Sequence, residues 1–160
     1  MDNYLSETKR EPVVSTTASF VALALLTLAA IVASPHVPTV ARAVANLPVS
    51  AVGVAWGRAH GGTCVVHDDL IVTCESMDSG YTNAGTTVGN VWLYRQLGGP
   101  ARHRHEARHA DQWAMLGPLF PLLYGAETLR TSDLEQSVFE RWAGLHDGGY
   151  LRRPTTSADR

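Results

Sequence analysis

Residues 98–117 read GGPARHRHEARHADQWAMLG, and this stretch decides how the chain is interpreted. Pro100 marks a helix start, because proline lacks the N–H that has no partner in the first helical turn anyway. Gly117 and Pro118 follow the last apolar residue and mark the helix end. We therefore predict one helix that runs from Pro100 to Leu116.

An HExxH sequence, residues 105–109, lies inside this predicted helix. His105 and His109 are four residues apart, so they lie one turn apart on one face and can bind a single zinc ion. Glu106 would then lie beside a zinc-bound water and accept its proton as the water attacks a carbonyl group. The alternative is a solvated helix face that is merely rich in His and Arg.

A catalytic zinc needs a third protein ligand, and we select Glu140. The Ser132-x-x-Glu135 capping box predicts a second helix over residues 133–143, which Gly144 closes. Glu140 shares a face with small residues, so its carboxylate can lie close to another helix. The alternatives are that Glu140 faces water and that Glu127 is the third ligand.

Upstream, two β-branched runs, residues 64–66 and 71–74, flank the turn-forming pair Asp68-Asp69. A hairpin that is symmetric about Asp69 places Cys64 opposite Cys74, within reach of a disulfide. A disulfide indicates an oxidising compartment. The alternative is a pair of reduced strand cysteines.

The segment 16–34, TTASFVALALLTLAAIVAS, lies in a run without charged residues that extends from Pro12 to Ala41. At 1.5 Å per residue it spans about 28 Å, close to the hydrocarbon thickness of a bilayer. We predict a transmembrane anchor, with a cleaved signal peptide as the alternative. Lys9 and Arg10 precede it, which favours a cytoplasmic N-terminus and an extracytoplasmic domain.

The chain has 160 residues, a formal net charge of −2 and 45% hydrophobic residues. The near-neutral charge argues against nucleic acid as a partner. We predict a cytoplasmic tail (1–15), the anchor (16–34), an α+β domain (40–151) and a disordered tail (152–160). Within the domain, residues 49–56 can be helix or strand, residues 86–95 predict one strand, and residues 113–124 predict core or a membrane-facing loop.

The HExxH motif with a distant glutamate resembles the gluzincin group of zinc metallopeptidases. More closely, the chain is similar to small, largely uncharacterised bacterial membrane proteins with HExxHxxQ, a Gly-Pro-aromatic turn and a late glutamate before alanine. The matching segments are residues 105–113, 117–120 and 139–143. The resemblance implies a zincin-like domain that binds one Zn²⁺ per chain through His105, His109 and Glu140, with Glu106 as general base.

Two departures from the zinc-peptidase pattern concern charge. Arg108 stands between the motif halves, where such helices usually carry uncharged residues, so it must reach solvent or a carboxylate, or else the site is atypical. Gly144 stands where thermolysin-like enzymes have a further carboxylate, which leaves the support of the ligands open. The cluster Arg102, His103 and Arg104 is interpreted as a solvated face.

Three weaker candidates complete the predicted site. Gln112, one turn after His109, can hydrogen-bond near the metal or be an ordinary polar residue of the helix edge. Asn90 belongs to the predicted strand before the helix, which in zinc peptidases can pair with an extended substrate but is otherwise a core strand. Tyr150 can stabilise an oxyanion or pack on the domain.

These features favour a membrane-anchored zinc metallopeptidase that acts on peptide or protein substrates. The alternative is a non-catalytic, membrane-anchored binding module with a structural metal or none. Glu106 distinguishes the two, because catalysis requires it and metal binding does not.

Overall fold

The computed structural model describes residues 37–81, 85–96, 98–131 and 133–151. The predicted N-terminal tail, anchor and C-terminal tail lie outside these residues. The described chain contains helices and one four-stranded sheet, so the expected mixture of α and β structure is confirmed. The elements are α2 (Thr39–Ala59), β1 (Thr63–Val66), β2 (Val72–Glu75), β3 (Thr86–Val88), β4 (Val91–Leu93), α3 (Pro100–Leu116), α4 (Leu119–Arg130), the 3₁₀ helix η1 (Leu134–Gln136) and α5 (Val138–Ala143).

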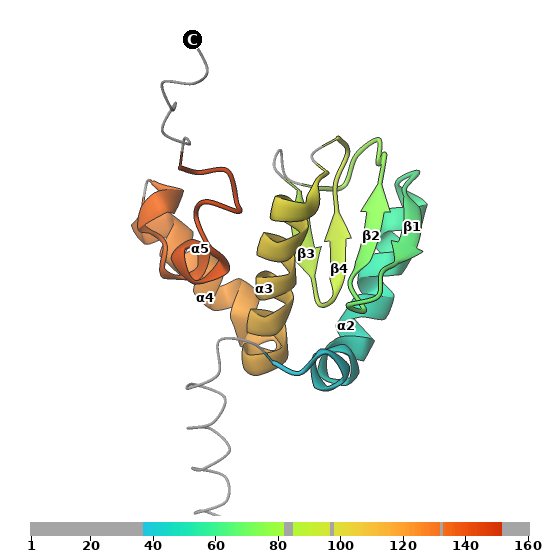
Figure 1. The fold of residues 1–160 in the computed structure, drawn as a ribbon, viewed down its shortest axis with the longest axis horizontal. Coiled ribbons are helices and arrows are strands. Elements are labelled where there is room, and N and C mark those ends of the chain that lie inside the picture. The colour runs from blue at the N-terminus through green and yellow to red at the C-terminus, as the bar shows by residue number, and fades with distance from the viewer. Residues whose placement is uncertain (1–36, 82–84, 97, 132, 152–160) are drawn as a thin grey trace, which may run out of the picture. The chain divides into compact units, whose positions relative to one another are not determined.

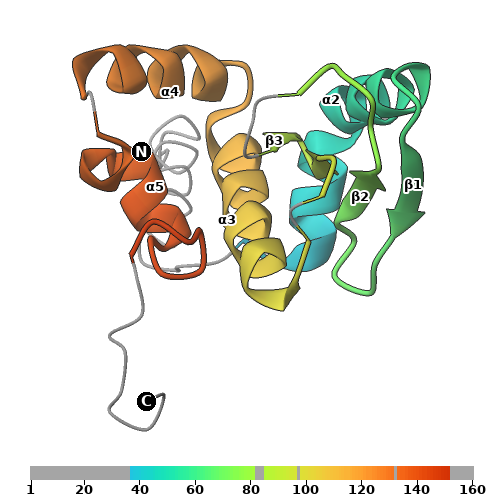
Figure 2. The same cartoon turned by 90° about the horizontal axis from the view of Figure 1, so that it is seen from above.

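The sheet has the order β1-β2-β4-β3, with β2 and β4 parallel and the two outer pairs antiparallel. The single strand predicted over residues 86–95 was wrong. Gly89 has a φ of +63°, which favours glycine, and the chain reverses there to form the β3–β4 hairpin. This reversal makes β3 an edge strand, and α3 lies between the sheet and the helices α4 and α5 (Figure 1; Figure 2).

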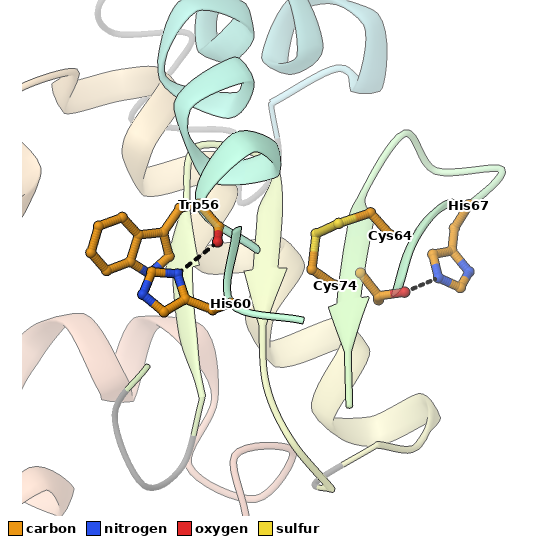
Figure 3. The surroundings of a disulfide bond; sticks show 6 residues. Trp56, His60, Cys64, His67 and Cys74 are labelled. Atoms are coloured by element: carbon orange, nitrogen blue, oxygen red, sulfur yellow. Dashed lines mark hydrogen bonds between the residues drawn. A yellow bond between two sulfur atoms is a disulfide. The ribbon is translucent and has the colours of Figure 1, made fainter. Parts of the chain in front are cut away.

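The predicted hairpin symmetry is confirmed. Cys64 pairs with Cys74 in the β1–β2 register, and the two residues form a disulfide (Figure 3). Leu70 has a φ of +59°, and its N–H donates to the carbonyl of His67 to close the turn. The disulfide joins β1, at the edge of the sheet, to β2, next to the core.

The residues left open as helix or strand, 49–56, belong to the long helix α2. Two glycines bring this helix close to the sheet. A Cβ atom on Gly53 would lie 3.0 Å from the Val91 Cβ, and one on Gly57 would lie 2.7 Å from the Cys74 sulfur. Among the described helices, α2 is the one whose length and apolar composition would allow it to cross a membrane.

Residues 113–124 do not form a loop, because most of them belong to α3 and α4. Pro121 is tolerated in the first turn of α4, where backbone N–H groups have no intrahelical partner.

The helix predicted over residues 133–143 was also wrong as a continuous element. Ser132 lies outside the described residues, and Asp133 caps η1 by accepting the Glu135 N–H. Extended backbone at Ser137 then separates η1 from α5. The small-residue face of α5 is buried against α3, as expected, whereas Val138 and Trp142 remain exposed.

Candidate metal site

Three predicted ligands meet between α3 and α5. His105, His109 and Glu140 are all buried, and one ligand atom from each lies within 4.8 Å of the others. The two histidine Nε2 atoms are 3.1 Å apart, and Glu140 Oε2 lies 3.1 Å from His105 Nε2 and 3.5 Å from His109 Nε2. This group could hold a metal ion.

The other ring nitrogens of the histidines face hydrogen-bond acceptors. His105 Nδ1 lies 3.2 and 3.1 Å from the carbonyl oxygens of Ala143 and Gly144, so it carries the proton. His109 Nδ1 lies 2.8 Å from Gln112 Oε1, an orientation fixed by the Gln112 amide, which donates to the Phe139 carbonyl. With the proton on Nδ1, each ring turns its Nε2 atom toward Glu140 Oε2.

This convergence of acceptors fits a cation. Glu140 Oε2 is buried and has no hydrogen-bond partner among the described residues. Zinc ligands lie about 2.0–2.1 Å from the ion, so two ligands of a tetrahedral site are about 3.3–3.4 Å apart. The separations of 3.1, 3.1 and 3.5 Å are close to that value.

Without a metal, a proton can take the place of the cation. Burial lowers the pKa of His109, but the close approach of the Glu140 carboxylate and the charges of Glu106 and Glu140 outweigh burial and raise this pKa. Burial raises the pKa of the Glu140 carboxyl, but the close approach of the His105 and His109 rings outweighs it and holds this pKa well below its usual range. Glu140 is therefore an ionised carboxylate.

Two tyrosines complete the surroundings of Glu140. The hydroxyl of Tyr124, in α4, donates to Glu140 Oε1 and leaves Oε2 for the metal position. The Tyr150 ring lies 5.9 Å from the His105 ring, and burial raises the pKa of both tyrosines, so each keeps its proton. Sequence reasoning missed Tyr124, because nothing in the sequence shows that α4 packs beside α5.

Glu106 lies beside the two histidines in a cavity of about 650 Å³. The Thr87 hydroxyl, on β3, donates to Glu106 Oε2 over 2.7 Å, and Trp113 Nε1 donates to the Thr87 carbonyl over 2.8 Å. Sequence reasoning missed this role of Thr87. The remaining wall is largely apolar and comes from β3, α3, α4 and η1: Val88, Trp113, Phe120, Pro121 and Leu134.

The structure answers the question about the basic residues of α3. Arg108 reaches a carboxylate, because its guanidinium lies 3.2 Å from Asp147 and also donates to the Ala143 carbonyl over 2.7 Å. Arg104 binds the same Asp147 at 3.0 Å, and His103 binds Asp69 at 2.9 Å. The cluster is thus not simply a solvated face, since Arg104 and Arg108 attach the segment after α5 to α3.

His105 is oriented by backbone carbonyl groups, so no further carboxylate is needed at position 144. The carbonyl groups of Ala143 and Gly144 accept from His105 Nδ1, a role that backbone carbonyls often fill at metal sites. Gly144 has a φ of +94°, and a Cβ atom there would lie 2.5 Å from Arg108 Nη1. Glycine therefore allows both contacts at this position.

Two candidates lie elsewhere. Asn90 is buried next to the β3–β4 turn, where it accepts from Asn46 and donates to the Leu70 carbonyl, and it does not line the cavity. Glu127 binds Arg130 at 2.8 Å and accepts the Val138 N–H, so it holds α4 and α5 together. In this structure Asn90 does not line the cavity and Glu127 does not belong to the group of potential metal ligands.

Comparison of the chain with protein-family models, with curated proteins and with solved structures finds no match.

Proposed function

We propose that this protein is a zinc-dependent metallopeptidase, with one zinc ion held by His105, His109 and Glu140. The observation that carries the proposal is the convergence of three lone-pair donors, each fixed by a hydrogen bond at its other polar atom. Two histidines and one carboxylate are a ligand set of catalytic zinc sites, which keep one position open for water or substrate.

When bound, zinc supplies a Lewis acid and lowers the pKa of a bound water. Glu106 then serves as general base and passes the proton to the leaving amine. The Thr87 hydroxyl orients the Glu106 carboxylate for this task. Tyr150 lines the same cavity and keeps its proton, so we propose that it donates a hydrogen bond to the developing oxyanion.

The proposed substrates are peptides or proteins outside the cytoplasm. The Cys64–Cys74 disulfide supports this location, because such bonds persist mainly in oxidising compartments. The apolar cavity wall supports a substrate with an apolar side chain near the reacting bond. The predicted anchor at residues 16–34 would hold the domain at the membrane.

The test is metal content of the purified full chain in detergent, by elemental analysis. We expect about one zinc per chain, which His109→Ala and Glu140→Gln reduce and the exposed control Glu135→Gln leaves unchanged. Peptide-library hydrolysis follows, with Glu106→Gln expected to keep zinc and lose activity.

Absence of zinc under chelator-free conditions would overturn the proposal. Zinc that binds stoichiometrically without hydrolysis of any peptide would instead favour the non-catalytic binding module. Hydrolysis that survives Glu106→Gln would refute the assignment of the general base.

A further inference from the structure

Helix α2 has the reverse of the polarity that a surface helix of a water-soluble domain shows. Its buried residues are Arg42, Asn46, Gly53 and Gly57, so both large buried side chains are polar. Five of its exposed side chains are large and apolar: Val40 (67%), Val44 (68%), Leu47 (67%), Val52 (63%) and Trp56 (48%); the exposed charged residue is Arg58, in the last turn. A helix that faces water normally carries its polar residues outside.

The two large buried side chains of α2 bind polar groups of the domain. Arg42 pairs with Asp111 of α3 at 3.2 Å and donates to the Asp69 carbonyl. The Asn46 amide donates to Asn90 and to the Ala110 carbonyl. Small residues at the contact and hydrogen bonds across it are features of helices that pack in a lipid environment, where apolar side chains gain nothing by facing inward.

The outer side of α2 carries little charge. Between Arg42 and Arg58 the helix has no ionisable residue, and Arg58 lies in its last turn. The helix also begins five residues after the apolar run that ends at Ser34, and no charged residue occurs between Pro12 and Ala41. The first three residues of α2 therefore belong to the same uncharged run as the segment predicted to enter the membrane.

We propose that α2 lies in the plane of the membrane interface, with the face formed by Val40, Val44, Leu47, Val52 and Trp56 in contact with lipid acyl chains. The sheet packs along the other side of α2, where the helix contacts all four strands. Only one side of α2 can therefore be immersed, which is the geometry of an interfacial helix.

The test uses the full chain with single introduced cysteines, since both native cysteines are in the disulfide. Val44→Cys and Val52→Cys are spin-labelled in phosphatidylcholine vesicles, and accessibility to oxygen and to a water-soluble nickel complex is measured. The matched control is Val66→Cys on β1, which is 65% exposed and precedes the polar turn at Asp68 and Asp69.

We expect the labels at positions 44 and 52 to be accessible to oxygen, protected from the nickel complex and at similar depths. The label at position 66 should instead be more accessible to the nickel complex than to oxygen. Equal nickel accessibility at all three positions would overturn the proposal, because the face would then lie in water. Dipolar broadening between labels at position 44, with protection from both reagents, would overturn it in favour of a second copy. Depths at positions 44 and 52 that differ by about 12 Å, the helical rise of eight residues, would overturn the in-plane geometry.

Discussion

Replacing Gln112 with methionine removes the residue that orients His109, the second proposed zinc ligand, while keeping a side chain of similar length. Gln112 is fully buried, accepts from His109 Nδ1 over 2.8 Å and donates to the Phe139 carbonyl over 2.9 Å. Loss of such a partner typically weakens metal binding by about 10- to 100-fold. This corresponds to about 1.4–2.7 kcal/mol of binding free energy.

The same change leaves the Phe139 carbonyl without its donor, which costs about 1–3 kcal/mol of unfolding free energy. Gln112→Glu separates the two effects. It retains an acceptor for His109 but places a second acceptor against the Phe139 carbonyl. We therefore expect Gln112→Glu to lose stability and keep metal affinity, whereas Gln112→Met loses both.

Zinc affinity is measured by competition with a chromophoric chelator, and stability by urea unfolding of the metal-free protein. Gln136→Met is the control, because Gln136 is an exposed glutamine of η1. If folded Gln112→Met binds zinc as tightly as the unchanged chain, Gln112 does not support the site and the reasoning from its hydrogen bonds fails.

Three further predictions concern the framework of the site. Gly57→Ala places a Cβ atom 2.7 Å from the Cys74 sulfur, so we expect about 1–3 kcal/mol of destabilisation in urea unfolding. The control Gly125→Ala meets nothing within 4 Å and should stabilise the helix by up to about 1 kcal/mol. Equal effects of the two substitutions would contradict the close approach of α2 to the sheet. Thr87→Val removes the donor to Glu106, so kcat should fall at unchanged zinc content, and an unaltered kcat would argue against this orienting role. The hydrogen bond from Arg104 holds the pKa of Asp147 below its ordinary value of 3.8, so the ion pair stabilises the fold above that pH and is lost as the pH falls through the lower folded value. In unfolding experiments with chelator present, the free energy of unfolding of the unchanged chain should exceed that of Asp147→Asn by an amount that shrinks below about pH 4. A difference independent of pH would refute the assignment.

Local patterns predicted the parts of this protein that depend on neighbours in the sequence. Pro100 and Gly117 bound α3 because they act on the backbone of their own helix ends. The symmetric spacing of Cys64 and Cys74 about Asp69 predicted their register, since a hairpin pairs residues by their distance from the turn. The spacing of His105 and His109 placed both on one face for the same local reason.

Patterns failed where a distant contact decided the conformation. The segment 86–95 has the composition of one strand, yet it reverses at Gly89, whose missing side chain leaves space for Ser50 of α2. The second helix breaks at Ser137, and its apolar residues Val138 and Trp142 face outward. Hydrophobic periodicity identifies an apolar stripe but not what covers it.

By itself the sequence determined the HExxH helix, the disulfide hairpin and the identity of three potential ligands. Only the tertiary structure decided that Glu140 rather than Glu127 approaches the histidines, because this depends on how α5 packs on α3. It also placed Thr87, Tyr124 and the Gly144 carbonyl at the site, from segments far apart in the chain. Residue types and spacing specify which groups can bind a metal, whereas the packing of helices and strands specifies which groups orient them.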